Sequence, residues 1–461
     1  MATATDGMPR NLRRTMPGMI LLCVLILGTG VRLALIHPVQ NYLLDFRAYY
    51  AAATAATGGL DPYDTDSVRA HVTLPGQQRI IGYLYPPPTL WLFAGFAKLP
   101  YPAAQVPWLV LQFGLGVAAL GLILRALRCE FGSPASVLVG FAFLGSAAVW
   151  ELFRWGQFDM IVVLLLTLAI ASMLGDRATS AGTLRLRSGQ AGPGRHIPLS
   201  GGVWLGLAAV AKVTPIVYLA VLAIRKRWKP AAAGLAVIVA LFAGALIWPG
   251  YGPTLSWLDG LQSFSADQHA AMSPNNLSLR GFVYRLFVEH PTHEGPSVPW
   301  IDLGLATARW IVRLAAVALC IVTAGWLWLR RRDLSTAECV CAVIPLVLLL
   351  APQTSAHHCV QLLLPLAFII VTACRCRRIP AVDVVWITLI VLLFVLGSGG
   401  RVESASKPWL NHLISPTTTY AVGLTWLFFV ARFVSLKQTA AGIQRVREPK
   451  SARQARPALA N

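Results

Sequence analysis

Long apolar runs recur along almost the whole chain and limit its fold to a bundle of membrane-spanning helices. A span needs about 20 apolar residues, with roughly 17 to 25 tolerated. Only 13% of the residues are charged, whereas a soluble surface needs about a quarter. The sequence therefore predicts an all-α polytopic membrane protein with about ten spans. The candidate spans are residues 17–36, 107–124, 134–150, 158–174, 230–248, 304–329, 337–350, 359–374, 381–398 and 418–435.

Basic residues stand in short clusters at the ends of these runs and give the chain a net charge of +20. This is the pattern by which membrane proteins keep lysine and arginine on the cytoplasmic side. The charge therefore indicates topology, and we expect membrane lipid and no nucleic acid as a partner. The clusters are Arg10–Arg14, Arg125–Arg128, Arg225–Lys229, Arg330–Arg332 and Arg375–Arg378.

The apolar segment 200–224 has basic residues on both flanks, so both of its ends are predicted to be cytoplasmic. A single crossing cannot return to its own side, and the sequence favours a re-entrant hairpin that turns at Lys212–Pro215. An ordinary crossing would place the later arginine clusters outside. The charge on Lys212 has two interpretations: a structural lysine paired inside the hairpin, or a functional charge within the membrane.

With this hairpin, the loops at 37–88, 151–157, 249–303, 351–358 and 399–417 are predicted to be extracytoplasmic, and the loop at 175–199 cytoplasmic. Residues 1–436 would form one transmembrane catalytic domain. Residues 437–461 would form a basic cytoplasmic tail. The topology of the short apolar stretch 89–99 stays open.

Polar side chains gather in the predicted extracytoplasmic segments. Asp45 begins the helical run that contains Tyr49, and a carboxylate at that place can also be a helix cap. Asp61 and Asp64 belong to turns. Tyr85 precedes three prolines that fix an extended segment.

Later segments add amides, an arginine and two histidines to the same side. They are Gln157, Asn276, Arg280, His357 and His358. Paired histidines at a membrane interface often have no function in binding or catalysis. A metal site would also need a third ligand, and the sequence does not identify one. We therefore expect neither a metal nor a cofactor. The eight cysteines show no metal-binding spacing and are predicted to be structural.

The ordered set of short motifs resembles the bacterial polyprenol-phosphate-mannose-dependent α-1,2-mannosyltransferases, which belong to the GT-C superfamily of membrane glycosyltransferases. No single motif is specific, but the order is, and the resemblance covers roughly residues 17–435. The motifs are Asp45–Tyr50, Asp61–Tyr63, Tyr85–Pro88, Gly156–Gln157, Gly206–Pro215, Asn276–Leu279 and Ser355–His357.

The resemblance implies a GT-C-type helical bundle in the bacterial inner membrane. It implies transfer of a sugar from a polyprenyl-phosphate donor to an extracytoplasmic glycan or glycolipid acceptor. The catalytic acid maps onto Asp45 and the functional histidine onto His357. The late loop departs from the family pattern around Gln353, and Asp159 stands where the family usually has asparagine, which leaves sugar and acceptor identity open.

A single inverting displacement fits these residues, because a phosphate leaves readily and the acceptor hydroxyl needs a base. Asp45 would take the proton, and Arg280 or His357 would neutralise the phosphate. Tyr49 and Tyr85 could stack against sugar faces. The remaining residues that we expect to bind substrate are Gln157, Asn276 and His358.

Two other functions remain open on sequence alone. A lipid-linked sugar flippase or transporter would carry ionisable residues deep within its spans. Another membrane polysaccharide enzyme, such as an O-antigen ligase, would use a diphosphate-linked donor.

Overall fold

The computed structural model describes residues 10–36, 43–75, 79–179, 198–266, 271–273, 275–292, 295–297, 299–376, 378–397 and 417–447. Its elements are α1 (Arg10–Ile36), α2 (Leu44–Thr57), α3 (Thr65–His71), η2 (Pro87–Thr89), α4 (Leu90–Phe96), α5 (Tyr101–Ala126), α6 (Pro134–Leu144), α7 (Ala147–Trp155), α8 (Asp159–Thr179), α9 (Leu199–Ala211), α10 (Ile216–Ile224), α11 (Trp228–Ala245), η3 (Leu246–Gly250), α12 (Tyr251–Ala266), α14 (Leu279–Phe287), β1 (His290–Thr292), β2 (Gly295–Ser297), α15 (Gly304–Leu329), α16 (Thr336–Leu350), η4 (Ala356–Leu362), α17 (Leu363–Cys374), α18 (Ala381–Leu396), α20 (Thr417–Phe428), η5 (Phe429–Phe433) and α21 (Val434–Arg447).

The chain folds as a helical membrane protein, as predicted. Six helical segments of the described residues are long and apolar enough to cross a membrane, and the bent pair α6 and α7 would make a seventh. Four shorter apolar helices, α8, α9, α16 and α18, pack among them. The two strands form one small antiparallel hairpin. The predicted number of ten spans stays a prediction.

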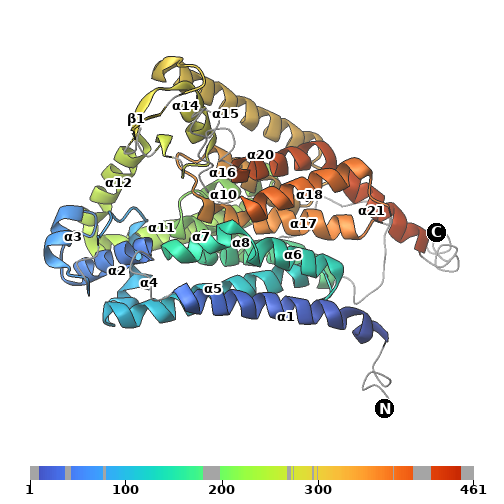
Figure 1. The fold of residues 1–461 in the computed structure, drawn as a ribbon, viewed down its shortest axis with the longest axis horizontal. Helices are drawn as coiled ribbons and strands as arrows, with labels where there is room; N and C mark the ends of the chain where they lie inside the picture. The colour runs from blue at the N-terminus through green and yellow to red at the C-terminus, as the bar shows by residue number, and fades with distance from the viewer. Residues whose placement is uncertain are drawn as a thin grey trace, which may run out of the picture.

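Some helices face lipid and others face protein, and the two environments favour different side chains on the helix surface. α15 exposes large apolar side chains along its length, among them Trp310, Leu314 and Ile321, as expected for a helix in contact with lipid. By contrast, nearly every residue of α17 is buried. α17 therefore lies inside the bundle, and α15 lies on its outside (Figure 1).

The basic clusters that end the apolar runs lie together in space. Arg225 donates hydrogen bonds to the carbonyl oxygens of Arg331 and Leu334, at 2.6 and 2.8 Å. Arg375 donates to the carbonyl oxygen of Leu127. α1 begins and α21 ends at this same end of the bundle, while α2, α3 and α12 lie at the other (Figure 1). This grouping agrees with the charge pattern, and the compartment itself stays a prediction.

The segment 200–224 breaks into α9 and α10 at Lys212–Pro215, where the hairpin was predicted. The start of α9 touches the start of α11, because a Cβ on Gly202 would overlap the backbone of Pro230. α10 ends at Ile224, four residues before α11 begins. Both ends of the segment therefore lie beside the start of α11, and the chain turns back on itself. Entry of this hairpin into a membrane stays a prediction.

The segment 134–157 differs from its predicted form. Residues 151–157 were expected to be a loop after a span at 134–150, but the helix bends by 42° and α7 continues to Trp155. The bend follows from Gly145 and Ser146: the Ser146 side chain accepts from the backbone N–H of Val149 and starts a new helix. The sequence 89–99 forms the short helix α4. Most of the loops at 175–199 and 399–417, and the end of the tail, lie outside the described residues.

Candidate active site

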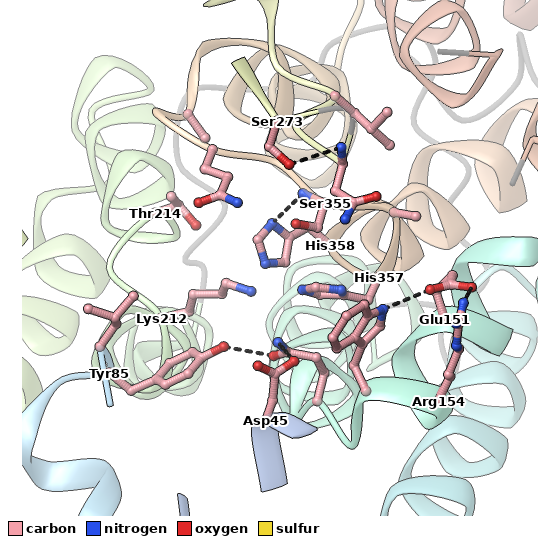
Figure 2. Close-up of a pocket in the computed structure, with 18 of the residues that line it drawn as sticks. Asp45, Tyr85, Glu151, Arg154, Lys212, Thr214, Ser273, Ser355, His357 and His358 are labelled. Atoms are coloured by element: carbon pink, nitrogen blue, oxygen red, sulfur yellow. Dashed lines mark hydrogen bonds and ion pairs between the residues drawn. The ribbon is translucent and has the colours of Figure 1, made fainter. Parts of the chain in front are cut away.

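A cavity of about 1070 Å³ opens among α2, α7, the α9–α10 turn and η4. Its lining includes six of the residues singled out in the sequence: Asp45, Tyr49, Tyr85, Gln157, His357 and His358. These residues are as far apart as 45 and 358 in the chain, and the helical bundle brings them to one place (Figure 2). The cavity also contains Lys212 from the turn of the hairpin.

Asp45 is held by an amide and does not cap its helix. The Gln157 side-chain nitrogen Nε2 donates to Asp45 Oδ2 over 2.5 Å. The hydroxyl groups of Tyr49 and Tyr85 each lie 2.7 Å from Gln157 Oε1, and both donate to it. These two donors fix which end of the amide is the acceptor, and so turn its N–H₂ group toward Asp45. Tyr49 is almost fully buried among aromatic rings, so its role in this geometry is to position Gln157.

The environment of Asp45 suits a proton acceptor. Burial raises the pKa of its carboxyl to about 7, while the Gln157 hydrogen bond and the charge of Lys212 act in the opposite direction. Asp45 is half-buried, and it lines the cavity. A carboxylate with a pKa near neutrality can take a proton and release it again at physiological pH.

Cationic and imidazole groups face Asp45 across the cavity. The Lys212 ammonium pairs with Asp159 Oδ1 at 2.7 Å, and the Asp159 side chain is only 1% exposed. The rings of His357 and His358 meet edge to face, with centroids 4.3 Å apart. His358 Nδ1 accepts from the backbone N–H of Ser355 at 3.1 Å, so the proton of its neutral ring is on Nε2. Figure 2 shows Lys212 and both histidines converging above Asp45.

Asp159 lies near the two histidines, at the position that a third metal ligand would take. Ligand atoms of Asp159, His357 and His358 all lie within 4.8 Å of one another. The Lys212 ammonium already occupies one oxygen of Asp159, and its positive charge would oppose a divalent cation at the same point. The ammonium of Lys212 therefore makes this group a poor site for a divalent cation.

Asn276 and Arg280 do not line the cavity. Asn276 is fully buried and connects two loops: its Nδ2 donates to the carbonyl oxygens of Ala271 and Pro352, and its Oδ1 accepts from the backbone N–H groups of Ser278 and Thr354. The Arg280 guanidinium lies 5.4 Å from the centroid of the Tyr284 ring. Asn276 thus acts on the site by holding the segment that carries the histidines.

We expect Asn276→Ala to lower the free energy of unfolding by about 2–4 kcal/mol, because it leaves two buried backbone N–H groups without an acceptor. Thermal unfolding in lipid nanodiscs measures this change. Asn275→Ala is the matched control, since the side chain of Asn275 is exposed. Equal melting temperatures for the two variants would contradict the bracing role of Asn276.

Sequence reasoning missed three charged residues of the cavity wall, Arg32, Glu151 and Arg154. Glu151 and Arg154 lie on α7, within a segment expected to be a loop. They are three residues apart, and this spacing places two side chains on one face only when the segment is a helix. The helical signal was present in Ser146, a residue type that starts helices.

A multi-pass helical bundle with a large cavity, a carboxylate on one wall and cationic and imidazole groups on another is the architecture of a membrane-embedded group-transfer enzyme. The sequence profile of glycosyltransferase family 87 matches residues 83–352. The chain belongs to this family and is a membrane glycosyltransferase. Lys212, Gln157 and Asn276 lie within the matched range, whereas Asp45 and His357 lie outside it.

A curated relative is similar in sequence to most of the chain. The chain is 25% identical over 373 residues to the polyprenol-phosphate-mannose-dependent alpha-(1-2)-phosphatidylinositol mannoside mannosyltransferase of Mycobacterium tuberculosis (strain ATCC 25618 / H37Rv). The alignment covers 75% of each of the two chains.

Proposed function

We propose that this protein transfers mannose from a polyprenyl-phosphate carrier to a glycan or glycolipid acceptor on the extracytoplasmic side of the bacterial inner membrane. The family supplies the reaction class, and the relative's name supplies the donor. The observation that carries the proposal is the cavity itself, in which the carboxylate of Asp45 faces Lys212 and two histidines.

The reaction is a single inverting displacement. The acceptor hydroxyl gives its proton to Asp45, and its oxygen attacks the anomeric carbon of the donor sugar. The bond between that carbon and the phosphate oxygen breaks, and its electron pair stays on the phosphate. Gln157 keeps Asp45 aimed at the acceptor throughout.

The leaving phosphate gains negative charge, and three groups of the cavity are placed to stabilise it. Lys212 supplies an ammonium group, and His358 supplies an Nε2–H donor. His357, which was expected from the sequence to meet the phosphate, lies beside them. Arg280, the other candidate, lies away from the lining, so Lys212 takes its place in this proposal.

The experiment uses purified protein in nanodiscs with radiolabelled polyprenyl-phosphate mannose and a mannose-terminated glycolipid. We expect labelled product that is one sugar longer than the acceptor. Movement of the carrier between leaflets without product would indicate a flippase. Competition by a diphosphate-linked sugar, and none by the monophosphate-linked sugar, would indicate a ligase.

The rate should depend on pH through Asp45. Only the deprotonated carboxylate accepts a proton, and burial holds its pKa at about 7. Well below pH 7, we expect kcat/KM to fall about tenfold for each unit of pH. A pH–rate profile measures this, and a rate that stays constant down to about pH 5 would contradict Asp45 as the base.

A further inference from the structure

One wall of the cavity is made by α7 and has no part in the mechanism above. Helix α7 buries Ala148, Val149, Leu152 and Phe153 in the bundle. The opposite face lines the cavity with Trp150, Glu151, Arg154 and Trp155. Residues 150 and 154, and residues 151 and 155, are each four apart, so the two pairs share one helical face.

The carboxylate of Glu151 is fixed in place by its own helix. Its Oε1 accepts from Arg154 at 3.1 Å and its Oε2 accepts from the indole N–H of Trp155 at 2.7 Å. The Glu151 side chain is 18% exposed. A carboxylate held this way still has lone pairs for a ligand, because each oxygen accepts two hydrogen bonds.

A cation and two half-buried indoles complete this wall. The guanidinium of Arg32 covers the ring of Trp150 at 3.5 Å. Trp150 and Trp155 are both half-buried. Aromatic rings and arginines also anchor proteins at membrane interfaces. However, Glu151 and the groups that bind it face the cavity and not only the outer surface.

Backbone contacts set this wall next to the catalytic carboxylate. The carbonyl oxygen of Arg154 accepts from the backbone N–H of Leu43, at the start of α2, over 2.8 Å. Gly156 has a φ of 71°, and a Cβ there would press on Phe46 and Leu43. Two residues after Trp155, Gln157 binds Asp45. The α7 face and Asp45 therefore form one rigid unit.

The geometry of an inverting displacement indicates which substrate lies beside the α7 face. In an inverting displacement the acceptor oxygen and the leaving phosphate lie on opposite sides of the anomeric carbon. In Figure 2, Lys212 points into the cavity from the left of the view and Glu151 lies on the right, with Asp45 below them. With the phosphate at Lys212, the acceptor sugar lies on the side of Glu151.

We propose that Trp150, Glu151, Arg154 and Trp155 bind the terminal sugar of the acceptor, a pyranoside with neighbouring hydroxyl groups. A pyranose has an apolar C–H face that stacks on an indole, and a rim of hydroxyls that a carboxylate and a guanidinium bind. The inference rests on the proposed function for its geometry, and it names the specificity-determining wall of that site.

The test compares Glu151→Gln with Glu130→Gln, a matched change at an exposed carboxylate outside this cavity. In transfer assays with octyl α-mannoside, Glu151→Gln should raise the acceptor KM by about 10- to 100-fold, the usual effect of losing a charged hydrogen-bond partner. The donor KM should stay within about twofold. Trp155→Phe, which removes the N–H that orients Glu151, should raise the acceptor KM in the same direction.

Binding of octyl α-mannoside to the full chain in nanodiscs, measured by calorimetry without donor, separates this inference from the proposed function. A loss of affinity in Glu151→Gln but not in Glu130→Gln supports the acceptor site, even if no mannose is transferred. Equal affinity in both variants and the unchanged protein overturns it, and so does a rise confined to the donor KM.

Discussion

Asp45→Asn should lower kcat by about 10²- to 10⁴-fold, the contribution of a positioned general base. Asparagine has the shape of aspartate and can still accept from Gln157, so the clamp of Gln157, Tyr49 and Tyr85 stays in place. Insertion into the membrane and donor binding should therefore be unchanged. Transfer kinetics on the purified variant measure the loss.

Asp66→Asn is the control for this change. The Asp66 side chain is 93% exposed and pairs only loosely with Arg69 within α3. The control should transfer sugar at the normal rate. If Asp45→Asn also retains near-normal turnover, another group accepts the proton and the assignment of the base is wrong.

Lys212→Met should have the second large effect. It should lower both the stability of the protein and the rate of transfer. The substitution leaves the buried carboxylate of Asp159 without its cation, which typically costs about 3–5 kcal/mol of stability. It also removes a positive charge from the proposed phosphate site, which we expect to slow transfer by about 10²- to 10³-fold.

A second substitution separates these two effects. In Lys212→Met with Asp159→Asn, neither charge is left unpaired, so thermal stability should return close to that of the unchanged protein. Transfer should stay slow, and the donor KM should stay high. Arg280→Ala, at a position outside the cavity lining, should leave the donor KM within about twofold.

The double variant decides between the two interpretations of Lys212. If it transfers sugar at a near-normal rate, the lysine only pairs with Asp159, and the phosphate is held elsewhere. If Lys212→Met alone is as stable as the unchanged protein, the ion pair does not support the fold.

The helical fold could be predicted from sequence because its causes are local. Apolar length defines a span, and lysine and arginine at its ends mark one side. The turn at Lys212–Pro215 was predictable for the same reason, since basic residues flank both ends of segment 200–224. The bend at Gly145 and Ser146 was missed, because a continuous apolar pattern does not report a change of helix direction.

The site was only partly predictable, because its contacts join distant parts of the chain. Asp45 and the histidine pair could be singled out from their motifs. The clamp on Asp45 depends on Gln157, which is 112 residues away, and the partner of Lys212 is Asp159, 53 residues away. Glu151 and Arg154 were missed with the helix that carries them. Asn276 was predicted to bind substrate, and its observed contacts brace the loop before the histidines.

The central claim is that Asp45 on α2 and the histidines on η4 open into one aqueous cavity. The accessibility of two introduced cysteines tests this most directly. Ala48→Cys and Ala356→Cys, each made in a chain without the native cysteines, place thiols on the two walls. A small impermeant thiol reagent should label both from the same side of sealed vesicles, and polyprenyl-phosphate mannose should protect both. Labelling of the two positions from opposite sides would contradict the account.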